Sequence, residues 1–405
     1  MKLLIINLDK SIFRPNSLSV ENLKDYSRFF DKLFVIAWTR GEEKPIFSED
    51  RLFIYPTNSR SRLFYIFDTY RIFKKFIRNE GIDMVSSQDP FETGLAAYLI
   101  SRIFSVKGAA PDIAFGEVKG GRGSASGGKI RLHLQSHTDF LGSYFWKESF
   151  LNKIRVLLAK FLIPRADCIR VVSERIRKSL VRVTPASPSE VGRARYPLRV
   201  AVLPIYVDVK KIREAPVNVN LHKKYSQFDF IILMASRLTR EKNIGLAIEA
   251  MAEVVKKYPK TGLVIAGSGS EREALKLQIT NYKLQKNIII EDWTDDLASY
   301  YKTADLFLLT SNYEGYGMAV VEAMAVGLAV IMTDVGLANE VLIDKKDGIV
   351  IPVGNKEKLT EAILNLIENQ SLRTRLIENS QKTLDFWPDR NQYLRAYRES
   401  WLICC

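Results

Sequence analysis

The sequence of 405 residues contains few of the residues that build disulfide frameworks and zinc sites. It has three cysteines, Cys168, Cys404 and Cys405, and three histidines, His133, His137 and His222. These numbers and spacings exclude a disulfide framework and leave a zinc site almost without ligands. We therefore expect no metal and read the adjacent C-terminal cysteines as an ordinary reduced tail rather than a lipidation site.

Long apolar segments are also absent. No run of 18 uncharged apolar residues occurs, which argues against a transmembrane helix. The apolar run near the N-terminus has only four residues, 3–6, and predicts a buried first strand rather than a signal peptide. A composition of 47% hydrophobic and 26% charged residues excludes a disordered chain. We expect a cytoplasmic enzyme.

Three ligand-binding motifs are missing. No Asp-x-Asp pair occurs that could hold a divalent metal on a diphosphate, and no glycine-rich loop ends in Gly-Lys-Ser/Thr. The segment Gly267-Ser268-Gly269 is followed by Arg272 where a third glycine would complete the dinucleotide fingerprint. A nicotinamide or flavin cofactor is therefore poorly supported.

The positive charge lies entirely in the first half of the chain. Residues 1–200 contain 34 Lys and Arg against 20 Asp and Glu, which gives +14, whereas residues 201–405 contain 26 of each. The excess is densest at 151–200, with twelve basic and three acidic residues. A basic half predicts a polyanionic partner, either nucleic acid or an anionic membrane surface, and a simple solubility surface is the alternative.

Short apolar segments alternate with amphipathic segments along the whole chain. This alternation is typical of parallel sheets covered by helices on both faces. In the first half it predicts strands at 3–8, 33–38, 51–55, 84–87, 130–134 and 168–173, and helices at 18–31, 62–79, 91–104, 147–163 and 174–182. In the second half it predicts strands at 229–236, 262–267, 287–292, 305–311, 328–333 and 348–351, and helices at 243–258, 271–283, 295–302, 318–327, 336–343 and 355–369. We expect an α/β chain with two doubly wound, Rossmann-like domains.

Two segments set the expected domain boundaries, one around Pro204 and one at residues 386–388. Residues 199–209 predict a linker, which divides the chain into an N-terminal domain at 1–203 and a C-terminal domain at 204–386. Residues 387–405 predict one more helix that returns to the N-terminal domain. Residues 105–129 are rich in glycine and serine and predict a flexible surface insertion.

Polar residues follow several predicted strands of the second half, where ligands bind in an open parallel sheet. Arg237 and Lys242 supply the cations that a diphosphate needs, with a solvated loop as the alternative. Gly315 and Gly317 let the backbone approach a ligand closely, and the helix that begins near Met318 offers free N–H groups to an anion.

Glu322 is the only charged residue between Gly315 and Thr333. A carboxylate in so apolar a helix is costly unless it is hydrogen-bonded or paired. The hydroxyls of a bound ribose would satisfy it, and a structural ion pair is the alternative.

These residues resemble glycosyltransferase family 4, the retaining enzymes with the two-domain GT-B fold. Glu314 and Glu322 match the Glu-x7-Glu signature of that family, and Arg237 with Lys242 matches its diphosphate clamp. Similar segments occur at 333–340 and 347–353, and in the first half at 86–94, 137–139, 169–174 and 204–208. The similarity covers nearly the whole chain except 105–129.

The resemblance implies a role for each matching residue. Glu322 should bind the donor ribose and Glu314 the transferred sugar, while His137 should lie near the reacting sugar unless it is a structural histidine. His137, Arg237, Lys242 and Glu314 form the implied catalytic set. The backbone at Gly317, Met318 and Ala319 should hold the diphosphate, Gly267, Ser268, Trp293 and Thr294 should flank the base, and Gly315 and Tyr316 complete the implied donor-binding set.

The implied reaction is transfer of a sugar from a nucleoside diphosphate sugar to a hydroxyl of a glycan or lipid-linked acceptor, as in polysaccharide biosynthesis. It would proceed with retention and without a metal or other cofactor. A nucleotide-sugar epimerase of the same fold remains an alternative, although the Glu-x7-Glu signature argues against it.

The basic half leaves two further interpretations. A nucleic-acid-binding protein ranks last because the basic residues lack an interleaved aromatic platform, so we expect no nucleic acid partner. Helix 147–163 is either a packed amphipathic helix or one that lies on anionic lipid, which would make the protein peripheral on the cytoplasmic membrane face.

Overall fold

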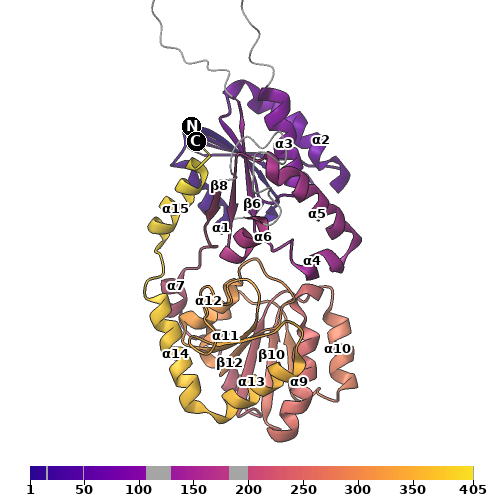
Figure 1. Ribbon diagram of the computed structural model, residues 1–405, viewed down its shortest axis with the longest axis vertical. Helices are drawn as coiled ribbons and strands as arrows, with labels where there is room; N and C mark the ends of the chain where they lie inside the picture. Colours follow the sequence, from indigo (N-terminus) through magenta and orange to yellow (C-terminus); the bar gives the residue numbers. More distant parts are fainter. Residues whose placement is uncertain (15–16, 49, 106–128, 182–198, 405) are drawn as a thin grey trace, which may run out of the picture.

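The structure, a computed structural model, describes residues 1–14, 17–48, 50–105, 129–181 and 199–404. Two α/β domains follow one another along its long axis (Figure 1). The N-terminal sheet has the strand order β3-β4-β2-β1-β5-β6-β7-β8 and is parallel except for the β3–β4 pair. Its strands are β1 (Lys2–Asn7), β2 (Lys32–Ala37), β3 (Ile46–Ser48), β4 (Leu52–Pro56), β5 (Met84–Ser87), β6 (Arg131–Ser136), β7 (Cys168–Val171) and β8 (Arg199–Val202).

The C-terminal sheet is fully parallel, in the order β11-β10-β9-β12-β13-β14. Its central strands consist almost entirely of buried apolar residues because helices cover both faces. The strands are β9 (Phe230–Ala235), β10 (Thr261–Ala266), β11 (Ile288–Glu291), β12 (Leu306–Leu309), β13 (Ala329–Thr333) and β14 (Ile349–Ile351).

Helices lie on both faces of each sheet. The α-helices of the first half are α1 (Leu18–Ser27), α2 (Tyr65–Ile72), α3 (Glu92–Ser105), α4 (Ser143–Glu148), α5 (Phe150–Leu162) and α6 (Glu174–Val181). Those of the second half are α7 (Val209–Glu214), α8 (Leu221–Lys224), α9 (Ile244–Lys257), α10 (Arg272–Asn281), α11 (Leu297–Thr303), α12 (Met318–Ala325), α13 (Lys356–Glu368), α14 (Gln370–Leu384) and α15 (Arg390–Leu402).

The side chains of β1 alternate between two hydrophobic layers, one on each face of the sheet. Leu4 and Ile6 pack into the core beneath α2, α3 and α5, whereas Leu3 and Ile5 pack into the core beneath α1 and α15. Successive side chains of a strand point to opposite faces, so β1 contributes to both layers.

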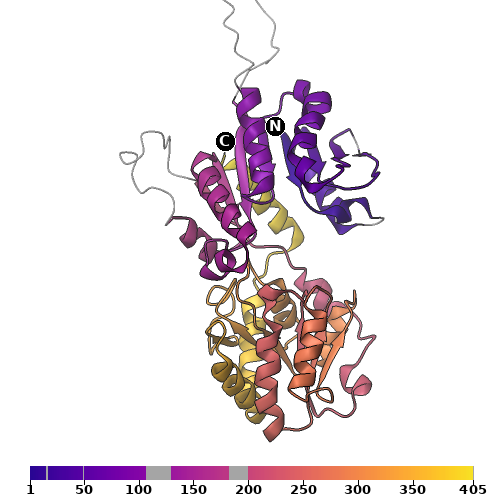
Figure 2. The same cartoon turned by 90° about the vertical axis from the view of Figure 1, so that its right-hand side faces the viewer.

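The C-terminal helix α15 belongs to the N-terminal domain, although it follows the C-terminal domain in sequence (Figures 1 and 2). Arg390 pairs with Asp25 of α1 at 2.5 Å, and the Tyr397 ring stacks on Tyr26 with centroids 4.7 Å apart. The chain therefore passes between the domains twice, once after β8 and once before α15.

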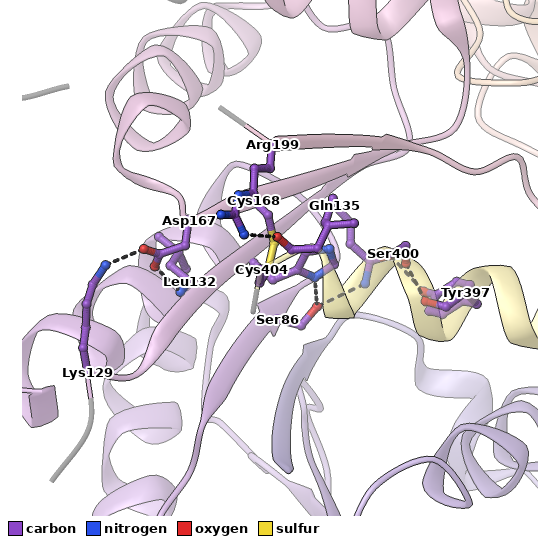
Figure 3. The surroundings of a disulfide bond; sticks show 12 residues. Ser86, Lys129, Leu132, Gln135, Asp167, Cys168, Arg199, Tyr397, Ser400 and Cys404 are labelled. Carbon is purple, nitrogen blue, oxygen red and sulfur yellow. Dashed lines mark hydrogen bonds and ion pairs between the residues drawn. A yellow bond between two sulfur atoms is a disulfide. The ribbon is translucent and has the colours of Figure 1, made fainter. Parts of the chain in front are cut away.

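A disulfide joins Cys168 of β7 to Cys404 just beyond α15, with the two Cα atoms 5.2 Å apart (Figure 3). Arg199 Nη1 donates to the carbonyl of Ile403 at 2.7 Å beside it. The expectation of reduced cysteines is therefore wrong for this pair, because the return of α15 brings together two residues 236 positions apart. Cys405 lies outside the described residues.

Several expected elements differ from the structure. Residues 199–202, predicted as linker, form edge strand β8. The predicted helix 336–343 is wrong: this segment forms turns, with positive φ at Gly336 and Asn339, a backbone conformation that a right-handed helix cannot contain. Helices α7, α8 and α14 and strand β3 were not predicted. Most of the predicted insertion, 106–128, lies outside the described residues.

Candidate active site

Hydrogen bonds join two loops at the carboxyl ends of the neighbouring strands β9 and β12. The loop after β9 carries Arg237 and Lys242, and the loop after β12 carries Glu314. Thr310 Oγ1 donates to the carbonyls of Lys242 and Asn243 at 2.9 and 3.0 Å. Because this side chain fixes one loop against the other, the charged residues of both loops share one edge of the sheet.

Lys242 and Glu314 form an ion pair at this edge. Lys242 Nζ donates to Glu314 Oε1, which also accepts a hydrogen bond from Ser311 Oγ at 2.8 Å. The two side chains are only 16% and 12% exposed, whereas Arg237 is 72% exposed and pairs with Glu241 at 3.0 Å. The edge therefore presents cations suited to an anion next to a carboxylate suited to hydroxyl groups.

His137 follows β6 of the N-terminal domain and faces this edge across a cavity of about 360 Å³. The cavity brings together five residues predicted from the sequence. Burial, together with the neighbouring Arg170, lowers the pKa of His137 to about 3, so its imidazole is neutral near pH 7. The lining residues are His137, Thr138, Phe145, Glu148, Ser149, Leu151, Asn152, Arg155, Arg237, Glu241, Lys242, Tyr313, Glu314 and Gly315.

Gly315 is one of the points where the two domains touch. A Cβ atom placed there would lie 1.8 Å from the carbonyl oxygen of His137. Only glycine allows this approach. The sequence predicted that Gly315 brings the backbone close to a ligand; in the structure it brings the backbone close to His137.

Helix α12 carries Glu322 and begins at Met318 and Ala319, directly after Gly317, whose φ is +100°. Glu322 accepts a hydrogen bond from Tyr301 at 2.9 Å, and no Lys or Arg of the described chain forms an ion pair with it. Burial raises the pKa of Glu322, and the hydrogen bond from Tyr301 offsets only part of this effect. The carboxylate therefore retains capacity to accept hydrogen bonds from a ligand.

The other predicted donor-binding residues do not line the cavity. Gly267 directly follows β10 and is buried, Ser268 comes next and is exposed, and Trp293 and Thr294 lie just beyond β11, with Trp293 52% exposed. They lie at carboxyl ends of the same sheet, but outside this cavity. Tyr316 is buried with only 2% of its surface exposed, so its backbone alone is available to a ligand.

Five residues of α4 and α5 line the cavity without having been predicted for the site: Phe145, Glu148, Leu151, Asn152 and Arg155. Glu148 accepts hydrogen bonds from Tyr313 of the opposite domain and from Asn152 Nδ2 at 3.1 Å, and Arg155 pairs with Glu92 at 2.9 Å. The sequence predicted one helix at 147–163, but the chain breaks at Ser149, whose hydroxyl caps α5. This N-cap serine was the only local signal for the break that turns α4 toward the cleft.

A second contact between the domains lies at the N-terminus of α6. The carboxylate of Glu340 accepts from the backbone N–H groups of Glu174 and Arg175 at 2.8 and 2.5 Å. Arg175 also pairs with Asp334 at 2.5 Å. A carboxylate from the C-terminal domain thus caps a helix of the N-terminal domain and holds the two together beside the cleft.

Comparison with known proteins finds its family match in the C-terminal domain. Residues 221–383 match the family described as glycosyl transferases group 1. The chain is 34% identical over 170 residues to poly(glycerol-phosphate) alpha-glucosyltransferase of Bacillus subtilis, covering 42% of this chain and 24% of that relative. It is 26% identical over 182 residues to UDP-Gal:alpha-D-GlcNAc-diphosphoundecaprenol alpha-1,3-galactosyltransferase of Escherichia coli, covering 44% and 47%. The chain thus spans less than half the length of either relative.

A solved structure matches the whole chain. Anabaena HepE in complex with UDP superposes with a TM-score of 0.70 at 16% identity, over 99% of this chain and 100% of that one. This similarity extends through both domains, and the two-domain GT-B fold expected from the sequence is confirmed.

Proposed function

We propose that this chain, whose residues 221–383 match the family described as glycosyl transferases group 1, moves a sugar from a nucleoside diphosphate sugar to an acceptor hydroxyl. The observation that supports this most directly is the cavity between the domains. There His137 faces Arg237, Lys242 and Glu314, which lie at the strand ends where an open parallel sheet binds ligands.

We propose that the reaction retains the anomeric configuration and needs no metal. Lys242 and Arg237, with the N–H groups at the start of α12, would stabilise the negative charge that develops on the departing diphosphate. Glu314 would accept hydrogen bonds from the transferred sugar once a ligand competes with Lys242 for its carboxylate. The leaving phosphate would take the proton of the attacking hydroxyl, so no nucleophile of the protein is required.

A uracil nucleotide is the first donor to test, because HepE is described in complex with UDP and the Escherichia coli relative is named for UDP-Gal. For the acceptor, the two relatives are named for a poly(glycerol-phosphate) and a diphosphoundecaprenol-linked sugar. We therefore propose a glycan or lipid-linked acceptor, bound on the N-terminal side of the cavity near Glu148 and Arg155.

We further propose that α5 touches an anionic membrane surface on its cytoplasmic face. Phe150, Ile154, Leu157 and Phe161 form an exposed apolar stripe along this helix, with exposed fractions of 76%, 46%, 61% and 44%. Exposed lysines at 153 and 160 flank the stripe. Apolar and basic side chains on one face are what binding to anionic lipid requires. No helix in the described parts of the chain is long and apolar enough to cross a membrane.

Flotation with vesicles tests the membrane proposal. Vesicles containing an anionic lipid should retain the protein at low salt and release it at high salt. Leu157→Glu should abolish retention, whereas Leu277→Glu on α10, where the wild-type leucine is 62% exposed, should not. Equal retention of both variants would contradict the proposal.

Thermal unfolding with UDP, GDP and ADP, each with and without EDTA, tests the donor site. A nucleotide at 100 times its dissociation constant adds about 2.7 kcal/mol to the folded state, which should raise the transition by several degrees. Stabilisation by one nucleotide, unchanged by EDTA, is expected. No shift with any nucleotide would overturn the proposal, and product formed without an acceptor would favour an epimerase.

A further inference from the structure

Arg170 lies near the end of β7 and is buried, with 2% of its surface exposed. Nη1 donates to Gln135 Oε1 at 2.8 Å and to the hydroxyl of Tyr397 at 3.0 Å. Nη2 donates to the carbonyls of Leu203 and Pro204, both at 3.1 Å. The guanidinium also lies over the ring of Tyr397, 4.3 Å from its centroid. All of these partners are uncharged.

The charge of Arg170 therefore has no direct counterion. No Asp or Glu within the described ranges lies at ion-pair distance from it. A buried cation is costly without a carboxylate, and most such arginines are paired. An arrangement this costly is more easily understood if the cation serves the site beside it.

Arg170 also determines the orientation of the Gln135 amide. A guanidinium only donates hydrogen bonds, so the Gln135 atom that faces Arg170 must be the amide oxygen. The same oxygen accepts from Tyr397 at 2.9 Å and faces His137 Nε2 at 3.2 Å. Arg170 Nη1 also lies 3.5 Å from Nε2, a longer contact than the one to the Gln135 oxygen. The shorter contact favours a proton on Nε2, because an unprotonated ring nitrogen would oppose an acceptor. The other end of the amide donates to Ser86 at 3.2 Å, which agrees with this orientation (Figure 3).

The same guanidinium joins both places where the chain passes between the domains. Leu203 and Pro204 begin the first passage, directly after β8. Tyr393, whose hydroxyl accepts from Nη2 at 3.2 Å, and Tyr397 lie on α15, which follows the second passage. Arg170 thus links both connections between the domains to β7. This strand is the neighbour of β6, which His137 directly follows.

We propose that Arg170 is a positioning residue: it fixes Gln135, and through Gln135 the ring orientation and proton position of His137, while anchoring both connections between the domains. The inference rests on the proposed function only for what His137 does there. A neutral imidazole in this place can hydrogen-bond the transferred sugar without adding to the positive charge of Arg237 and Lys242.

Several charged or titratable groups surround His137 besides Arg170. They come from the helices of its own domain and from the loops of the opposite one. Those that line the same cavity are Glu148, Arg155, Arg237, Glu241, Lys242, Tyr313 and Glu314. These groups include both acids and bases. Arg170 is the buried charge next to the His137 ring that has no counterion in the described part of the chain, so replacing Arg170 alone measures its effect on the ring.

Histidine-selective ¹⁵N spectra between pH 5 and 8 test this inference in the full-length protein. The chain has three histidines, so His133→Gln and His222→Asn variants assign the signals. We expect the wild-type His137 ring to stay neutral with its proton on Nε2 over this range. In Arg170→Met the ring should take up its second proton at a higher pH. Turnover should fall at least tenfold, while stabilisation by UDP is retained.

A second variant keeps the test decisive if Arg170→Met does not fold. Gln135→Glu supplies the carboxylate that Arg170 lacks and should convert His137 to the imidazolium form near neutral pH. Gln392→Glu is the matched control, because this exposed residue hydrogen-bonds the backbone of Asp389 at the start of α15 and should leave the ring signals unchanged. A charged His137 in the wild type, or signals that Gln135→Glu does not move, would overturn the inference. Failure of every nucleotide to stabilise the wild type would overturn only the proposed function.

Discussion

Replacing Glu322 by glutamine should stabilise the free protein and weaken nucleotide binding. Glu322 is a half-buried carboxylate with one hydrogen bond, from Tyr301 at 2.9 Å, and no cation of the described chain compensates its charge. Glutamine keeps the shape and can still accept from Tyr301, but it removes the charge. The protein would then gain stability because it no longer buries an unpaired carboxylate.

The two effects have different sizes. A hydrogen bond to a charged group contributes about 1.5–3 kcal/mol, so losing the contact to a ribose hydroxyl should raise the Kd for the nucleotide roughly 10- to 150-fold. The gain in the free protein should be about 0.5–2 kcal/mol, and each kcal/mol raises the transition by about 2–4 °C.

The stabilisation should depend on pH. Burial raises the folded-state pKa of Glu322 above its ordinary value of 4.5. The stability that protonated Glu322 contributes is therefore complete below about pH 4.5 and is lost as the pH rises through the folded-state pKa. The advantage of glutamine should be absent in acid and full above that pKa.

Thermal unfolding of wild type and Glu322→Gln, with and without UDP, at several pH values measures both effects. Glu291→Gln is the control of opposite sign, because Glu291 accepts from Lys224 at 2.7 Å and its pKa is lowered by that and neighbouring hydrogen bonds against the effect of burial. It should lower the transition above pH 4.5. A less stable Glu322→Gln at neutral pH, or an undiminished UDP shift in it, would refute the reasoning.

Three other substitutions test the cavity and the disulfide. Lys242→Ala should reduce the rate of sugar transfer about 10²- to 10³-fold, because it removes a cation beside the departing diphosphate. The circular dichroism spectrum should be unchanged. Near-normal turnover would show that Lys242 is not part of the site. Gly315→Ala places a Cβ 1.8 Å from His137 O, so transfer should be lost while UDP still shifts the transition; full activity would mean that this contact opens during catalysis. Cys404→Ser removes a disulfide that spans 236 residues, and chain entropy predicts that the free energy of unfolding falls by up to about 5 kcal/mol. Dithiothreitol should destabilise the wild type by a similar amount and leave the variant unchanged. Equal unfolding temperatures of the two proteins without reductant would contradict the prediction.

The repeating elements could be predicted from the sequence because their signals are local. The apolar run at 230–235 and the helix at 244–257 follow from periodicity within a few residues. The predicted helix at 336–343 failed for a local reason too, since left-handed residues such as Asn339 are difficult to recognise among good helix formers.

The sequence by itself determined the two sheets and the charged residues at the ends of the second sheet, because strand periodicity and a carboxylate in an apolar helix are readable within one segment. Only the tertiary structure decided that Cys168 meets Cys404, that Glu340 caps α6 and that Arg170 reaches α15. Each of these contacts joins residues more than 150 positions apart, between which no pattern in the sequence specifies proximity. The first and third form because α15 returns to the first domain, and the second forms because the two domains pack against each other.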